Sequence, residues 1–106
     1  MNNLRFQGLV LSAQPIRYTP AGIAVIELEL QHQSVVEQAQ VQRQLSFDIH
    51  AIAMGDVAYA LSAVAIGDAL DIEGFVAPLR KSSSRLVLHI QKFQNHNVST
   101  SPAALV

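Results

Sequence analysis

Two segments of the sequence alternate strictly between apolar and polar residues, and this pattern constrains the fold more than any other feature. The first covers residues 23–32 and the second residues 43–52. Their apolar positions are Ile26, Leu28 and Leu30 in the first segment, and Leu45, Phe47 and Ile49 in the second. Alternation with a period of two predicts strands that bury one face. We therefore expect Phe47 to face a core and its neighbour Ser46 to face outward.

The remaining segments predict more strands and one helix. Residues 54–66 are rich in Ala and Leu, which favour a helix that begins near Asp56 and stops at Gly67. Residues 4–13, 68–77 and 85–93 are predicted as strands, with a bulge or bend at Gly8 and Gly74. The connections are a turn at 14–22, a loop or hairpin tip at 34–42, a flexible basic loop at 78–84 and a frayed tail.

This order of three strands, one helix and two strands predicts an all-β protein. Five short, strongly twisted strands with glycine bends match the five-stranded Greek-key barrel called the OB-fold, with one short helix between strands 3 and 4. The helix is expected to close the open end of the barrel. We expect one OB-fold domain over residues 1–95 and a flexible C-terminal tail over residues 96–106.

Composition excludes several classes of protein. The 106 residues contain no cysteine, so disulfides and cysteine-based metal sites are absent. The N-terminus does not resemble a signal peptide, and the longest mostly apolar tract, residues 57–66, is too short to span a bilayer. We therefore expect a cytoplasmic protein without a membrane partner. Charged residues make up only 14% of the chain, about half the usual share, and the apolar surplus favours a homodimer.

The charge is distributed unevenly along the chain. Residues 75–93 hold four of the seven basic residues, and residues 75–106 hold no acid. Residues 1–74 carry three basic residues and all eight acids, a net charge of 3 − 8 = −5, against +4 for the rest. A fold that keeps these charges apart would present a surface for an anion.

Several short motifs, in order over residues 3–93, carry a family resemblance. LRFQG (4–8), PIR (15–17) and PAGI (20–23) resemble the opening of bacterial single-stranded-DNA-binding proteins. LQHQSV (30–35), RQ (43–44), VAIG (64–67), IEGF (72–75) and LVLH (86–89) are similar to its primosomal, PriB-like branch. The resemblance implies an OB-fold homodimer that binds single-stranded DNA in replication restart, without catalysis or cofactor. Its implied partners are the restart helicase and other primosome proteins.

The candidate DNA contacts lie in three places. Single strands are held by cations that follow the phosphates and by aromatic rings that stack on bases. Arg80, Lys81 and Arg85 lie at the loop between the last two strands, which OB-folds commonly use for nucleic acid. Arg17 and Tyr18 lie in the turn after the first strand, and Arg43 lies beside the third strand. Simple packing explains Tyr18 equally well, and a solvated hairpin arginine explains Arg43.

Other positions favour weaker DNA binding than the family's. PriB-like proteins can present a stacking aromatic on the third strand, where this chain offers only Ser46 or the core-facing Phe47. Gln33 is neutral where a cation would help, and outward acids would repel phosphate. The alternative function is therefore an OB-fold protein-interaction module of the replication machinery with weak or no DNA binding.

The other side chains considered give a dimer hypothesis and no catalytic site. Val35, Val36 and Val41 are candidates for the dimer interface, and local hairpin packing is their other explanation. The four histidines lack metal-ligand spacing, and we expect structural roles for those on strands. No catalytic signature can be assembled, so neither an enzyme nor a metal site is expected.

Overall fold

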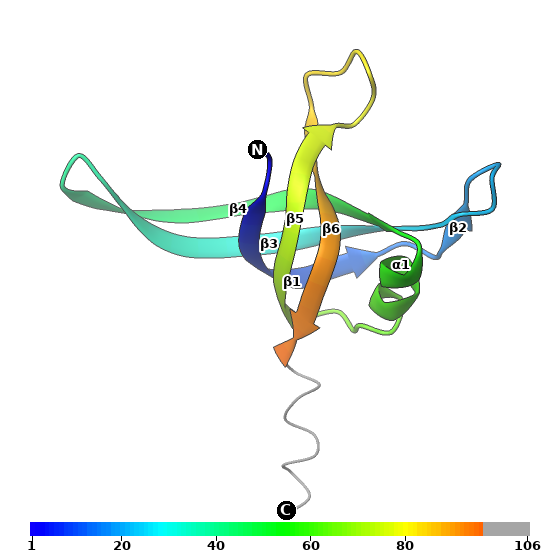
Figure 1. Ribbon diagram of the computed structural model, residues 1–106. Helices are drawn as coiled ribbons and strands as arrows, with labels where there is room; N and C mark the ends of the chain where they lie inside the picture. Colours follow the sequence, from blue (N-terminus) through cyan, green and yellow to red (C-terminus); the bar gives the residue numbers. More distant parts are fainter. Residues whose placement is uncertain (97–106) are drawn as a thin grey trace, which may run out of the picture.

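The computed structural model describes residues 1–96, which form a closed barrel of five long strands (Figure 1). Its elements are β1 (Leu4–Ala13), β2 (Arg17–Tyr18), β3 (Ala24–Gln38), β4 (Val41–Met54), α1 (Asp56–Leu61), β5 (Ala69–Pro78) and β6 (Leu86–Asn95). The strand order is β1-β5-β6-β4-β3-β2, and an additional β1–β3 pairing closes the barrel. The prediction of an all-β OB-fold barrel with one helix after the third long strand is confirmed.

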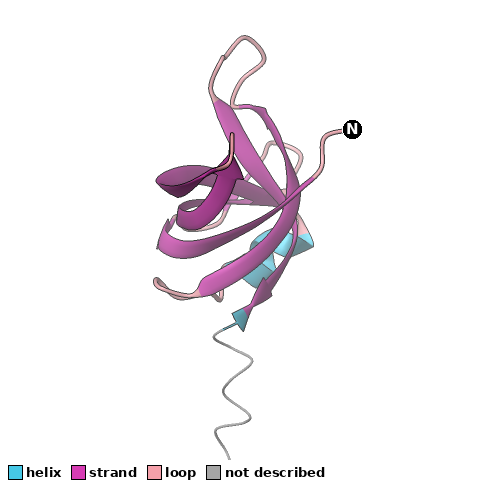
Figure 2. Cartoon of the chain, turned by 90° about the vertical axis from the view of Figure 1, so that its left-hand side faces the viewer, coloured by secondary structure: helices cyan, strands magenta, loops and turns pink. Residues whose placement is uncertain are grey.

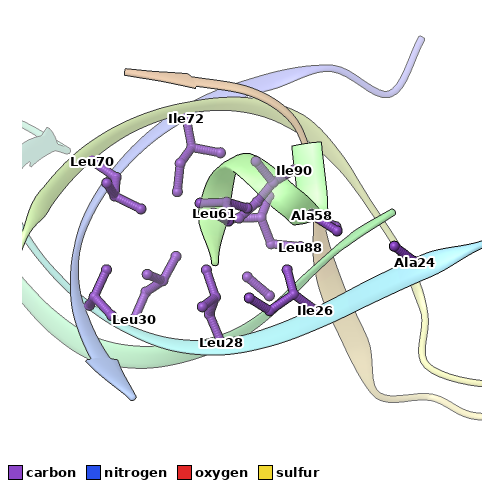
Figure 3. Close-up of a cluster of buried hydrophobic side chains, with 13 residues drawn as sticks. Ala24, Ile26, Leu28, Leu30, Ala58, Leu61, Leu70, Ile72, Leu88 and Ile90 are labelled. Carbon is purple, nitrogen blue, oxygen red and sulfur yellow. The ribbon is translucent and has the colours of Figure 1, made fainter. Parts of the chain in front are cut away.

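The core lies inside the barrel and continues onto the helix. Leu28 and Leu30 of β3 and Leu70 and Ile72 of β5 point toward one another, and all four are nearly inaccessible to solvent (Figure 3). Leu61, the last residue of α1, is fully buried in the same cluster. The helix lies at one end of the barrel (Figure 2). It therefore closes that end, as its small and apolar composition predicts.

The helix is shorter than predicted, and its end differs from the prediction. It covers Asp56–Leu61, not residues 54–66, and Asp56 is a first-turn acid after the N-cap Gly55. Gly67 does not stop it. That glycine has φ 92° in a later turn, where its N–H donates to the Val10 carbonyl at 2.7 Å. The structure also contains β2, a two-residue strand that pairs with β3. It lies within residues 14–22, which were predicted to form a turn.

The β3–β4 hairpin is longer than predicted and extends beyond the barrel. The two strands pair without interruption from Val25 and Met54 to Gln38 and Val41. Only Ala39 and Gln40 form the turn, both at positive φ (53° and 63°), which suits the twist of a two-residue hairpin. The segment 34–42 is therefore mostly strand. The part past the last β1 partner of β3, Gln31, is called the arm here and covers residues 32–47 (left in Figure 1).

The hairpin has two faces with different surroundings. The inner face carries the even-numbered residues of β3 and the odd-numbered residues of β4, which include the core residues Leu30 and Ala51. The outer face carries the alternate residues. On the arm the inner face continues with no barrel opposite it, so alternation there no longer guarantees burial.

Glycines permit two close approaches between strands. The register of β5 against β6 shifts between Glu73 and Gly74, which confirms the predicted bend. A Cβ at Gly74 would lie 1.8 Å from the His89 carbonyl oxygen. The bulge in β1 was predicted at Gly8 and lies instead between Val10 and Ser12. Gly8 sits in regular pairing, where a Cβ would lie 3.1 Å from the Leu30 Cβ.

The N-terminus is fixed to the barrel by a side chain. The Asn2 amide donates to the Val76 carbonyl at 2.6 Å, and the Val76 N–H donates back to Asn2 Oδ1 at 3.1 Å. This pair of bonds extends the β1–β5 ladder by one rung. At the other end of the chain His96 bonds Asp71, and the rest of the predicted tail lies outside the described residues. Within the described part of the chain, no helix is long and apolar enough to cross a membrane.

Candidate nucleic-acid interface

Three exposed cations lie around the loop between β5 and β6. Arg80, Lys81 and Arg85 are exposed, and no ion pair joins them to another described residue. The loop is closed by hydrogen bonds from the Leu79 N–H to the Arg85 carbonyl (2.8 Å) and from the Ser83 N–H to the Arg80 carbonyl (2.9 Å). Ser83 Oγ also accepts from the Arg85 N–H at 2.9 Å. The loop therefore presents positive charge that no acid within reach neutralises.

The cation on β2 is already paired. Arg17 donates to Glu27 Oε2 through Nη2 at 2.9 Å and through Nε at 3.2 Å. The hydrogen bond from Arg17 is the main reason that the pKa of the Glu27 carboxyl lies below its usual value. The neighbouring His50 bonds both Glu27 and Glu29. Arg17 therefore forms part of a network of charges on the outer face, where Glu27 offsets its positive charge.

Tyr18 and Arg43 also have partners within the protein. The Tyr18 hydroxyl accepts from the Tyr59 hydroxyl at 3.0 Å, and both rings are about half exposed. Arg43 lies on the arm and donates to Gln38 Oε1 at 2.6 Å. In Figure 1 the arm, β2 and the basic loop point in three different directions. The structure therefore does not bring the predicted contacts into one compact site.

An aromatic cluster lies where the arm leaves the barrel. Phe6 of β1 stacks on His32 of β3 with ring centroids 4.2 Å apart, and His32 lies 5.0 Å from the ring of Phe47. Phe47 is 41% exposed, so the prediction that it is a core residue is wrong. It faces inward as alternation predicts, but it lies beyond the closed part of the barrel. The sequence signal was available, because a two-residue turn at 39–40 puts His32 opposite Phe47.

The histidines have structural partners. His32 Nδ1 carries a hydrogen, because it lies 2.6 Å from the Gln7 carbonyl, which only accepts. His89 stacks on Phe75 with centroids 4.7 Å apart, and burial lowers its pKa. His96 bonds Asp71 at 2.6 Å and is the main cause of the lowered pKa of that carboxyl. Within residues 1–96, no group of three or more His, Cys, Asp or Glu side chains is arranged so that it could hold a metal ion.

Comparisons with known proteins place these features in context. The family model that matches residues 2–92 is described as another single-strand binding protein family. The chain is 39% identical over 92 residues to the replication restart protein PriB of Bordetella pertussis, covering 87% of this chain and 86% of that one. The solved structure of PriB from Ralstonia solanacearum is similar, with a TM-score of 0.82 at 32% identity, and the match covers 91% of this chain and 98% of that one. The chain shares the fold alone with the single-stranded DNA binding protein from Thermus aquaticus, at 17% identity and a TM-score of 0.72. That match covers 90% of this chain and 50% of the other.

Proposed function

This chain belongs to the single-strand binding protein family, in its PriB branch, and we propose that it binds single-stranded DNA as an accessory protein of replication restart. Membership of this family makes it a binding protein and not an enzyme. We further propose that the loop between β5 and β6 makes the main contact with DNA. A role in replication restart also implies a cytoplasmic location.

The basic loop is the observation that carries the proposal. Arg80, Lys81 and Arg85 are exposed at one end of the β5–β6 hairpin and have no acidic partner among the described residues. The other arginine near an OB-fold loop, Arg17, is offset by Glu27. Cations that contact phosphates release counterions from the strand, so binding through them weakens as salt rises.

The test is a titration of labelled oligothymidine followed by fluorescence anisotropy over a series of salt concentrations. Replacing all three loop cations with Gln should lower the slope of log K against log salt by about 2, at roughly 0.7 per phosphate contact on a single strand. The matched control is Arg17→Gln, which removes a cation already paired and should leave the slope nearly unchanged. Undetectable binding by the unaltered protein at low salt would refute DNA binding. An unchanged slope in the triple variant would refute the role of the loop.

We also propose that the protein is a homodimer and that it contacts the restart helicase and other primosome proteins. The three valines predicted for the interface lie on different faces, Val35 on the outer face and Val36 and Val41 on the inner face. Val35 and the outward Leu9 of β1 are 59% and 43% exposed and offer apolar surface for an interface on the outer side, and Val41 of the inner face is exposed to a similar extent, 61%. Light scattering should give twice the chain mass, and Val35→Asp should lower it. A monomer mass at micromolar concentration would refute the dimer.

A second candidate function is supported by the acids of the outer face. Glu27, Glu29 and Glu37 of β3 and Asp48 of β4 all lie on this face, where they repel phosphate. Such a surface suits a protein partner better than DNA. A protein-interaction module without DNA binding would capture replication helicases in pull-downs and yet show no anisotropy change with oligothymidine.

A further inference from the structure

The two faces of the β3–β4 hairpin carry opposite charges. All four acids of these strands lie on the outer face, and the single Lys or Arg of these strands, Arg43, lies on the inner face. The pairing of Val36 with Arg43 and of His32 with Phe47 fixes this assignment over the whole arm. A negatively charged strand approaching the arm is therefore repelled on one side and attracted on the other.

The inner face of the arm also carries its aromatic side chains. Phe47 is the only Phe, Tyr or Trp of β3 and β4, and it lies four residues from Arg43 on the same face. The rise of about 3.4 Å per residue in a strand puts their Cα atoms roughly 14 Å apart. Behind Phe47, His32 and Phe6 stack on each other and hold the cluster in place. The outer neighbour of Phe47, Ser46, has no ring to offer.

A cleft opens beside this cluster and is lined by residues of β1, β3, β5 and β6. Its volume is about 530 Å³, which is within the range of small-ligand sites. Its lining includes Phe6, His32 and Ser34, and also the cations Arg5 and Lys92. The carboxylates of Asp71 and Glu73 also line it, and Asp71 is bonded to His96. The cleft thus offers room for a base next to aromatic rings, with two cations and two carboxylates in its lining.

From these three observations we propose that the inner face of the arm is a second DNA contact, in which a base stacks on Phe47 and a neighbouring phosphate contacts Arg43. The strand then continues into the cleft beside Phe6 and His32. This inference rests on the proposed single-strand binding and adds the face and the residues to it. In this chain the stacking ring is on the side of the hairpin opposite to Ser46, away from the four acids of β3 and β4.

The experiment uses tryptophan as a reporter, because the chain contains none. Phe47→Trp puts the reporter on the inner face, and Ser46→Trp puts it one residue away on the outer face. With oligothymidine at low salt, the fluorescence of Phe47→Trp should be quenched by stacking and that of Ser46→Trp should change little. Quenching of Ser46→Trp alone or of both variants equally, or no quenching of either while anisotropy shows binding, would overturn the proposal.

Two further variants separate stacking from charge. Phe47→Leu should weaken binding roughly tenfold, within the range for loss of one stacked base, and leave the salt slope unchanged. Arg43→Gln should instead lower the salt slope by about 0.7. If the unaltered protein does not bind DNA at all, the proposed function itself fails. If it binds and Phe47→Leu binds equally well, only the inner-face inference fails.

Discussion

Replacement of Gly74 by Ala should be among the most damaging single changes to the barrel. The new Cβ would lie 1.8 Å from the His89 carbonyl oxygen, whereas side chains essentially never approach closer than 3.0 Å. The β5 and β6 backbones must therefore separate by the difference, 1.2 Å, at the Gly74–Ile90 pair. No side-chain rotation can relieve this contact, because both partners are fixed by the backbone.

Separating β5 from β6 should break backbone hydrogen bonds around the bulge and lower the free energy of unfolding. Losing two backbone hydrogen bonds at about 1 kcal/mol each, with a strain of about 1–3 kcal/mol, gives roughly 3–5 kcal/mol. For a chain of this size the melting temperature should fall by roughly 15–30 °C. Thermal melts followed by circular dichroism measure this directly. Gly22→Ala is the control, since its φ of 84° costs about 1–2 kcal/mol but no atom lies within 4 Å. A melting temperature of Gly74→Ala equal to or above that of the control would refute the reasoning.

Three further predictions concern the turn and two titrating side chains. Replacing Ala39–Gln40 with Asn-Gly should stabilise the protein by roughly 1–2 kcal/mol in urea melts, because both positions have positive φ. An unchanged free energy of unfolding would contradict the idea that this turn is strained. Because Arg17 lowers the pKa of Glu27, their interaction stabilises the fold above the ordinary glutamate pKa and is lost as pH falls through the lowered value. Arg17→Met should thus be less stable than the unaltered protein at pH 7, by under about 1 kcal/mol, and equally stable near pH 2. Burial lowers the pKa of His89, so the free energy of unfolding should fall as pH drops through 6.5. His89→Gln should reduce this dependence on pH. Identical curves of stability against pH for the two proteins would argue against a role for His89.

The sequence predicted the barrel well because its signals are local. Alternation in 23–32 and 43–52 identified the two longest strands, and Gly74 marked a bend that the structure contains. The helix was predicted too long because its Ala-rich segment continues past Leu61, where turns connect to β5. Helix propensity alone does not contain that tertiary information.

The candidate site was less predictable, because it depends on where the barrel ends. Alternation assigned Phe47 to the inner face correctly, but only the strand pairing shows that no strand covers that face on the arm. Likewise Arg17 looked free in the sequence, and its ion pair with Glu27 requires β2 to lie beside β3. Contacts between distant residues decided both outcomes.

The two hydrogen bonds between Asn2 and Val76 join residues 74 positions apart in the sequence, and this separation affects the order of folding. The β3–β4 hairpin joins neighbouring residues and can form early, and β3 also pairs with the second half of β1 from Leu9 onward. The first half of β1 pairs only with β5, whose Gly74 is opposite Leu4 across seventy positions. During synthesis the first residues made therefore remain without their partners until most of the chain has left the ribosome. We expect the first half of β1 to be among the last parts of the barrel to become protected from hydrogen exchange, although it is the first to be translated.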